Sequence, residues 1–134
     1  MKATKVLETC LYVDDLEKSK AFYTGVLGLP LHAEMKGRHV FFRCGEAMLL
    51  LFNPDATEQG NPDIDVPAHG ARGVGHCCFS MSETEIQLWK EHLRGHGVEV
   101  EKELDWPQGG KSLYFRDPCG NSLELATPRV WGLP

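Results

Sequence analysis

The sequence has no long apolar run, no paired cysteine motif and no excess of positive charge. Its 134 residues contain no stretch of about 18 apolar residues, which a membrane-spanning helix needs. The start, MKATKVLETCLYV, lacks the apolar centre of a secretory signal peptide. We therefore expect a cytoplasmic protein of one domain with no membrane partner.

The cysteines and the net charge exclude further classes of site. Five cysteines occur without any Cys-x-x-Cys pair, so neither a zinc knuckle nor a thioredoxin-type site is predicted, and the odd count favours free thiols over a disulfide framework. A formal net charge of −5 gives no electrostatic reason to bind nucleic acid. A small-molecule or protein partner is the remaining expectation.

One pattern of elements, β-α-β-β-β, occurs twice in the chain. In each copy an alternating strand leads into a helix whose N-cap candidate, Asp14 or Ser82, is followed three residues later by glutamate, and Gly28 and Gly97 are expected to end the helices. The strands expected after the helices lie at 31–36, 38–44 and 47–53 in the first copy and near 98–104, 111–116 and 121–127 in the second.

The duplication predicts the fold class and the limits of the modules. We expect an α+β fold of two tandem βαβββ modules that form a curled mixed sheet, with the helices on its outer face. Residues 55–72 are rich in Pro, Gly and Asp and have no period, which indicates a surface linker. Module one then spans about 4–54, module two about 73–128, and residues 129–134 form an arm expected to pack on a partner subunit.

The spacing within each copy identifies equivalent positions. Glu8 lies six positions before Asp14, and His76 lies six positions before Ser82, so Glu8 and His76 are expected at the same place on their strands. Counting back four residues from the proline that follows each last strand gives one further position per module. These two equivalent positions are Leu50 and Glu124.

Alternation along the strands predicts which of these side chains face a pocket. Leu123 and Leu125 are expected to face the core, so Glu124 points to the other side, as His76 does on its own strand. If the modules pair edge to edge and curl, Glu8, His76 and Glu124 converge there. One imidazole and two carboxylates suit one divalent ion such as Fe, Mn, Ni, Co or Zn, with positions left open for substrate.

Three segments of the chain resemble the vicinal-oxygen-chelate superfamily, which includes glyoxalase I, extradiol dioxygenases, fosfomycin-modifying enzymes and bleomycin-resistance proteins. They are VDDLEKSKAFYTGVLGL, GVGHCCFSMS and LYFRDPCGNSLELATP, and the resemblance covers nearly the whole chain. It implies a single domain, residues 1–134, with a U-shaped metal cleft that is commonly completed across a homodimer. It also implies metal ligands at Glu8, His76 and Glu124, with Leu50 at the fourth place.

The resemblance leaves the reaction open, because the chain departs from each well-known member. Leu50 has no ligand atom, whereas glyoxalase I supplies four ligands, and Glu8 stands where dioxygenases and fosfomycin enzymes typically have histidine. Tyr114 matches a pocket residue of the fosfomycin enzymes, but Cys10 replaces a threonine of that pocket and Gly109 an acidic residue.

The leading hypothesis is an enzyme whose metal chelates two oxygens of a small substrate, with Glu124 or Glu8 as the catalytic base. Lyase, isomerase, transferase and dioxygenase chemistry all fit this scheme. The alternative is a metal-free protein of the bleomycin-resistance type that binds a small molecule or antibiotic. The residues expected to line the substrate pocket are Cys10, Tyr12, Leu50, Cys78, Tyr114 and Arg116.

Other titratable side chains have simpler expected roles. Cys78 follows His76 by two residues, and side chains at that spacing on one strand face lie about 6–7 Å apart, too far for a thiol–imidazole hydrogen bond. Cys78 and Cys10 are therefore expected to be packing thiols. His39 and His69 are expected to face solvent.

Overall fold

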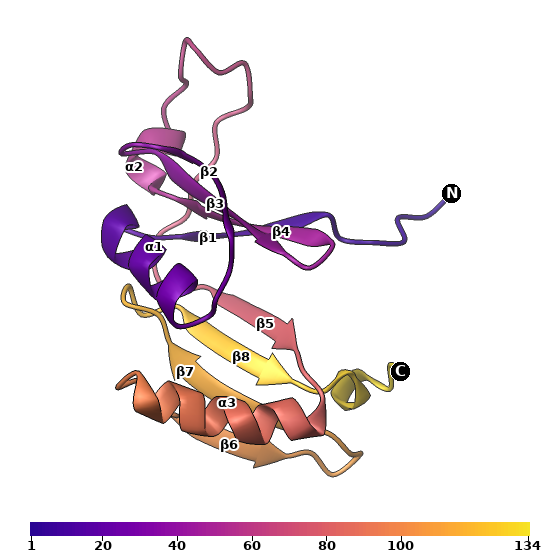
Figure 1. Ribbon diagram of the computed structural model, residues 1–134. Coiled ribbons are helices and arrows are strands. Elements are labelled where there is room, and N and C mark those ends of the chain that lie inside the picture. The colour runs from indigo at the N-terminus through magenta and orange to yellow at the C-terminus, as the bar shows by residue number, and fades with distance from the viewer. The chain divides into compact units, whose positions relative to one another are not determined.

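The structure, a computed structural model, describes residues 1–134 and divides into two compact units, Met1–Gly75 and His76–Pro134. Each unit contains one copy of the duplicated pattern (Figure 1). No helix is long and apolar enough to cross a membrane.

The first unit is a four-stranded mixed sheet with strand order β1-β4-β3-β2, in which β1 runs parallel to β4 and the other pairs are antiparallel. The elements are β1 (Glu8–Tyr12), α1 (Leu16–Gly25), β2 (Leu31–Met35), β3 (His39–Cys44), β4 (Ala47–Phe52) and α2 (Pro54–Thr57).

The second unit repeats this topology with strand order β5-β8-β7-β6, and β5 runs parallel to β8. The elements are β5 (His76–Ser80), α3 (Glu83–Gly95), β6 (Lys102–Asp105), β7 (Lys111–Arg116), β8 (Ser122–Ala126) and the 3-10 helix η1 (Pro128–Trp131). The predicted α+β fold of two βαβββ modules is thus confirmed, with one four-stranded sheet in each module.

Strand pairing gives the equivalence of the two copies independently of the helix caps. Cys10 pairs with Leu50 between β1 and β4, and Cys78 pairs with Glu124 between β5 and β8. Two residues earlier on the first strand of each sheet come Glu8 and His76, each in its own parallel pair. The predicted correspondence of the two modules therefore holds residue by residue.

The boundaries of the first helix differ from the prediction. Asp15, not Asp14, is the N-cap, and its side chain accepts a hydrogen bond from the Lys18 N–H. Strand pairing continues one residue beyond β1, because the Val13 N–H bonds to the Phe52 carbonyl, and this delays the helix. The helix ends at Gly25.

The second helix has the predicted Ser82 cap, and both hydrogen bonds of the capping box are present. The strand after it, however, begins at Lys102 rather than near 98. The reason is that the Val98 N–H bonds to the Leu93 carbonyl, which closes the end of α3 and removes Val98 from strand pairing.

Each sheet buries one face against its helix. In the first unit Tyr23 of α1 is fully buried and stacks on Phe42 with ring centroids 5.8 Å apart. In the second unit α3 packs on β7, and the buried side chains on the two elements include Ile86, Leu93 and Phe115. The strand positions that alternate with this core are consequently free to build a site on the opposite face.

The turn between β7 and β8 is organised by Asp117, which is buried. Its carboxylate accepts hydrogen bonds from the Cys119 N–H, the Asn121 N–H and the Asn121 side-chain amide, each at 2.9 Å. The segment RDPCGN therefore sets where β8 begins, and with it the register that places Tyr114 opposite Glu124.

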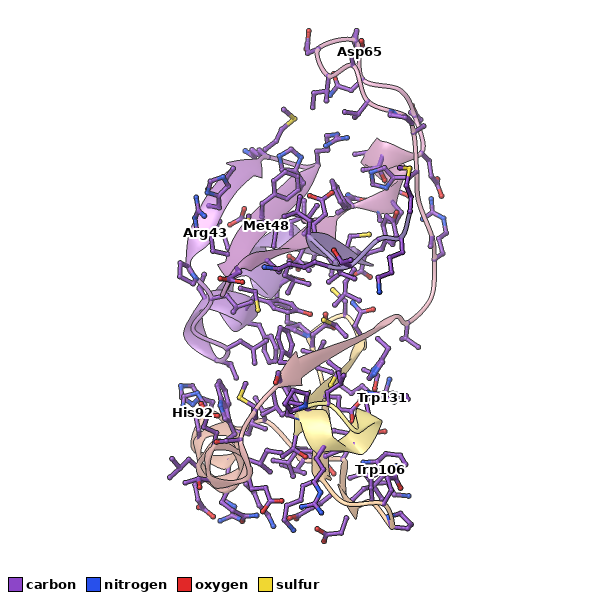
Figure 2. The ribbon with its side chains drawn as sticks, turned by 90° about the vertical axis from the view of Figure 1, so that its right-hand side faces the viewer. Arg43, Met48, Asp65, His92, Trp106 and Trp131 are labelled. Carbon is purple, nitrogen blue, oxygen red and sulfur yellow. The ribbon has the colours of Figure 1, made fainter.

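The C-terminal arm is held partly by its own unit. Gly110 has a φ of 96°, and a Cβ there would lie 2.8 Å from the backbone nitrogen of Val130, so the arm approaches this turn closely. Trp131, by contrast, is 81% exposed (Figure 2). That the arm packs on a partner subunit stays a prediction.

Candidate functional site

A histidine and a glutamate face each other on neighbouring strands of the second unit. His76 begins β5 and Glu124 lies at the centre of β8, with His76 Nε2 3.3 Å from Glu124 Oε2. The other ring nitrogen, Nδ1, lies 2.9 Å from the Ser122 carbonyl oxygen. Both nitrogens of the ring are therefore engaged within this one sheet.

The carbonyl partner determines which nitrogen of His76 carries hydrogen. A carbonyl oxygen only accepts, so Nδ1–H donates to Ser122 and Nε2 is directed at the carboxylate of Glu124. A lone pair on Nε2 facing a carboxylate oxygen requires a proton or a metal ion between them. Histidines that bind metal commonly donate the other N–H to a carbonyl in this manner, so the pair fits a divalent cation.

Tyr114 holds the second carboxylate oxygen of Glu124. Its hydroxyl donates to Glu124 Oε1 at 2.9 Å, and its ring stacks on His76 with centroids 6.5 Å apart. Burial, followed by the hydrogen bond to Glu124, raises the pKa of Tyr114, so the phenol stays protonated and remains a donor. The buried Glu124 is thus oriented by Tyr114 on one oxygen and by His76 on the other.

The third predicted ligand, Glu8, belongs to the first unit. It begins β1, its side chain is exposed, and it makes no ion pair. No group of three or more His, Cys, Asp and Glu side chains in the chain is arranged to hold a metal ion. Metal ligation by Glu8 together with the His76–Glu124 pair stays a prediction.

Cys78 lies directly beside Glu124 in the parallel pair of β5 and β8. Cys78 is exposed at its surface, but desolvation of the thiol by its neighbours, and then the negative charge of Glu124, raise its pKa to about 12. Its Sγ makes a long contact, 3.9 Å, to the Phe79 carbonyl and a hydrogen bond with the Glu124 side chain. Because the nucleophile would be the thiolate, this environment disfavours a catalytic role for Cys78.

In metal-free protein we expect Cys78 to resist alkylation by iodoacetamide at pH 8. A pKa raised to about 12 leaves about one thiol in 10,000 ionised at that pH, against about a quarter for an ordinary cysteine, so labelling should be slower by on the order of 1,000-fold. Labelling should accelerate about tenfold per pH unit until the pH approaches 12. Peptide mapping by mass spectrometry measures the rate, and urea-unfolded protein is the control. Rapid labelling of folded protein at pH 8 would contradict the assignment.

Arg116, a predicted pocket residue, is engaged by the protein itself. Its Nε donates to Glu101 Oε2 at 2.8 Å, and one Nη donates to the Gly120 carbonyl at 3.0 Å. The carboxylate of Glu101 raises the pKa of Arg116. Arg116 borders a shallow cavity of about 490 Å³ together with Tyr114 and Ser122, so it lies near the His76–Glu124 pair but already has a counter-charge.

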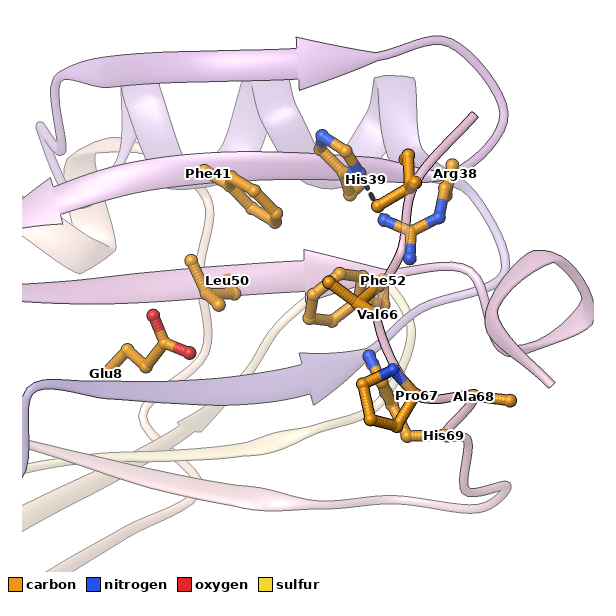
Figure 3. Close-up of a pocket in the computed structure, with 11 residues that line it drawn as sticks. Glu8, Arg38, His39, Phe41, Leu50, Phe52, Val66, Pro67, Ala68 and His69 are labelled. Atoms are coloured by element: carbon orange, nitrogen blue, oxygen red, sulfur yellow. Dashed lines mark hydrogen bonds between the residues drawn. The ribbon is translucent and has the colours of Figure 1, made fainter. Parts of the chain in front are cut away.

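A second cavity, of about 500 Å³, lies within the first unit (Figure 3). Leu50 and Glu8 of the predicted site line it, whereas Cys10 and Tyr12 are not among its lining residues. The full set is Glu8, Arg38, His39, Phe41, Leu50, Phe52, Ile64, Val66, Pro67, Ala68 and His69. This cavity is therefore mostly apolar and aromatic, with a carboxylate and an arginine in its wall.

The prediction that His39 and His69 face solvent is wrong. His39 is buried and stacks on Phe41 with ring centroids 4.0 Å apart. His69 Nδ1 shares a 2.6 Å hydrogen bond with the Tyr12 hydroxyl, and its ring lies edge-on to Phe52. His39 lines the cavity because the linker folds back over the sheet, and half-buried His69 lines it from the linker itself.

The linker is thus more than a surface connection. Thr57 accepts a hydrogen bond from the His69 N–H at 3.0 Å, and Arg72 forms ion pairs with Asp55 and Glu58 at 2.7 and 2.6 Å. These bonds bring residues 64–69 against the sheet as one wall of the cavity. Sequence reasoning missed this wall because the segment has no period and its contacts are with residues distant in sequence.

Comparison with known proteins places these observations in a family. The model of the Glyoxalase/Bleomycin resistance protein/Dioxygenase superfamily matches residues 5–125. The chain is 31% identical to the glutathione transferase FosA of Serratia marcescens over 118 residues, 86% of this chain and 74% of that protein. It is 28% identical to the metallothiol transferase FosB of Staphylococcus epidermidis over 132 residues, 95% of this chain and 84% of that protein.

The fold is similar to a solved structure over almost its entire length. The crystal structure of lactoylglutathione lyase from Agrobacterium tumefaciens matches with a TM-score of 0.95 and 40% sequence identity. The match covers 99% of this chain and 100% of that one.

Proposed function

Because the chain belongs to the Glyoxalase/Bleomycin resistance protein/Dioxygenase superfamily, we propose that it is a metal-dependent enzyme acting on a small oxygen-bearing substrate. The observation that carries the proposal is the pair of His76 and Glu124, with Nε2 and Oε2 3.3 Å apart. The bond from Nδ1–H to the Ser122 carbonyl supports metal ligation because it leaves the lone pair of Nε2 for a cation that His76 would hold.

The proposed ligand set is His76, Glu124 and Glu8, and the ion is one of Fe, Mn, Ni, Co or Zn. Glu8 would come from the first module of the same chain or of a second subunit in a homodimer. The absence of a bonded partner at Glu8 supports this role, because its carboxylate remains available for a cation.

When bound, the cation would polarise two substrate oxygens as a Lewis acid. The protein's own side chains divide the remaining tasks. The hydrogen bond from Tyr114 fixes Glu124, so Glu124 is suited to remain a metal ligand throughout the reaction. Glu8 has no such tether, and we propose it as the carboxylate that moves and accepts a proton from the substrate.

The names of the relatives indicate where to look for the substrate. A glutathione transferase, a metallothiol transferase and a lactoylglutathione lyase all handle a thiol or a thiol adduct by name. The first compounds to test are therefore adducts of α-ketoaldehydes with glutathione, and fosfomycin together with a thiol. Catechols complete the set, because dioxygenases belong to the same superfamily.

A metal-free binding protein is the second candidate function. Two observations favour it: no group of three ligand side chains in the chain is arranged to hold a metal, and the first unit has an apolar cavity of about 500 Å³. Such a protein would bind a small molecule or antibiotic without changing it, and would neither retain a metal nor turn over any compound of the set.

Metal analysis of untagged protein purified without chelator separates the two functions. The enzyme should contain about one Mn, Ni, Co, Zn or Fe per proposed site, and added metal should raise its melting temperature. His92 on α3 (Figure 2) and His96, the residue that caps its end, have ring centroids 4.3 Å apart and are another place where Ni or Zn could bind. A His92→Ala protein should therefore retain the stoichiometric metal. Protein without metal and without a shift in melting temperature would refute the metalloenzyme.

A further inference from the structure

Arg38 is a buried positive charge without a negative partner. It lies in the turn before β3, is 8% exposed, and forms no ion pair with any carboxylate. Its Nη1 donates to His39 Nδ1 at 2.8 Å, and its guanidinium lies 5.6 Å from the centroid of the Phe52 ring. Its Nε is buried and has no hydrogen-bond partner.

Burying this charge without a counter-ion is costly. A guanidinium cannot lose its proton in a protein, so the cost of burying it without a counter-ion is not relieved by neutralisation. His39 supplies no negative charge, and burial, followed by the charge of Arg38, lowers the pKa of His39 and keeps it neutral. Two exposed arginines, Arg72 and Arg94, by contrast have carboxylate partners.

The backbone holds Arg38 in place. Its N–H bonds to the Met35 carbonyl at 3.0 Å, and its carbonyl accepts from the Asn53 N–H at 2.9 Å. The stack of His39 on Phe41 fixes the imidazole that accepts from the guanidinium. The charge is therefore positioned before any ligand arrives, which reduces the entropy lost on binding.

The cavity around Arg38 is apolar on both sides (Figure 3). Phe41, Leu50 and Phe52 form the wall on the sheet, and Val66 and Pro67 face them from the linker. A volume of about 500 Å³ is within the usual range for a pocket that encloses a small organic molecule. Its occupant should accordingly combine an apolar body with one anionic group.

We propose that this cavity binds a small organic carboxylate, with the carboxylate on Arg38 and the apolar body between the phenylalanine rings and the linker. The planar guanidinium of Arg38, which lines the cavity, matches a carboxylate with two parallel hydrogen bonds.

Strand register gives the bound molecule a direction. His39, next to Arg38, pairs with Phe52, whereas Glu8 pairs with Met48, four residues away along β4 or about 13 Å. Figure 3 shows Glu8 and Arg38 at opposite ends of the lining. The carboxylate is repelled by Glu8 and attracted by Arg38, so the other end of the molecule points to Glu8. The binding itself does not depend on the proposed function, but this direction does, because the proposed function makes Glu8 a metal ligand. The substrate would then be an acid whose chelating oxygens lie at the end opposite its carboxylate.

Calorimetric titration of the full-length, chelator-treated protein tests the inference with three probes: benzoate, its neutral counterpart benzamide, and inorganic phosphate. We expect benzoate to bind at least about tenfold more tightly than benzamide, because only benzoate gives Arg38 a counter-charge. Phosphate should compete weakly, because it leaves the apolar walls uncovered. Equal affinity for benzoate and benzamide, or phosphate binding as tight as benzoate, would overturn the proposal.

Variants of Arg38 provide the second test. Arg38→Met keeps the apolar stem and should weaken benzoate binding on the order of 10- to 100-fold, with benzamide unaffected. Arg43→Met, on an exposed arginine of β3, the strand that Arg38 precedes, is the matched control and should bind benzoate as the unaltered protein does. If Arg38→Met does not fold, Arg38→Lys keeps the positive charge but cannot make two parallel hydrogen bonds, and its affinity for benzoate should still fall. Unchanged benzoate binding in a folded Arg38 variant would refute the assignment.

The result is independent of the metal. Benzoate binding by chelator-treated protein supports the acid-binding cavity even if no metal is ever found. Stoichiometric metal without any benzoate binding would leave the metalloenzyme standing and overturn this inference alone.

Discussion

Alanine at His76 is expected to reduce the metal content of the purified protein from about one ion per site to background. The side chain contributes the only imidazole of the proposed ligand set, and its loss leaves Glu124 with Tyr114 and Cys78 as partners. Because changing even an outer partner of a metal ligand typically costs 10- to 100-fold in affinity, loss of a ligand itself should cost at least about 100-fold. Calorimetric titration of both proteins with the metal that is found in the purified unaltered protein measures the change in affinity.

The fold should survive this substitution. The His76 side chain is 51% exposed, and the backbone pairing of β5 with β8 does not depend on it, so the free energy of unfolding of metal-free protein should change by less than about 1 kcal/mol. His92→Ala, the same replacement at an exposed position of α3, is the matched control and should keep full metal binding. A His76→Ala protein with unaltered metal affinity would remove the observation on which the metalloenzyme rests.

Asp117→Ala should destabilise the second unit more than any single change at the site. The buried carboxylate accepts three hydrogen bonds at 2.9 Å, and alanine would leave those donors without a partner in the turn. Unpaired buried donors cost about 1–3 kcal/mol each but do not add fully, so a loss of about 3 kcal/mol in the free energy of unfolding is expected. Urea unfolding followed by circular dichroism provides the measurement.

A weaker metal site should accompany that loss. The turn sets the start of β8, so its disorder loosens the register that places Tyr114 opposite Glu124. Asp105→Ala, which removes an exposed aspartate from β6 of the same unit, is the comparison and should be stable and bind metal normally. Equal stability of the Asp117 and Asp105 variants would show that the turn does not depend on its carboxylate.

Much of the fold was predictable because the chain repeats itself. A period-two pattern and a capping signal, each occurring twice, were sufficient to place Glu8 opposite His76 in the alignment of the modules, and the strand pairing agrees. The same alternation placed Glu124 between two core leucines, as observed. Local errors arose where two adjacent residues competed for one role, as when Asp15 rather than Asp14 capped the first helix.

The cavity of the first unit was not predictable from such patterns. Arg38 precedes a strand and would ordinarily be read as an exposed turn residue, and only the fold shows that its charge is buried without a partner. The wall opposite the sheet comes from residues 64–69, whose positions depend on single hydrogen bonds to Tyr12 and Thr57. Long-range contacts of this kind leave no periodic signal in a sequence.

The linker forms one wall of the cavity but no part of the His76–Glu124 pair, so the residues that select the ligand differ from those proposed to bind the metal. Residues 59–68 contribute no backbone hydrogen bond to the pairing of β1 to β4, so insertions or replacements there do not break the sheet. Figure 2 shows Asp65 at the outer end of this segment. Changes in this loop alone could therefore let related proteins bind different acids. Arg38 would still bind the carboxylate, and the His76–Glu124 pair would not need to change.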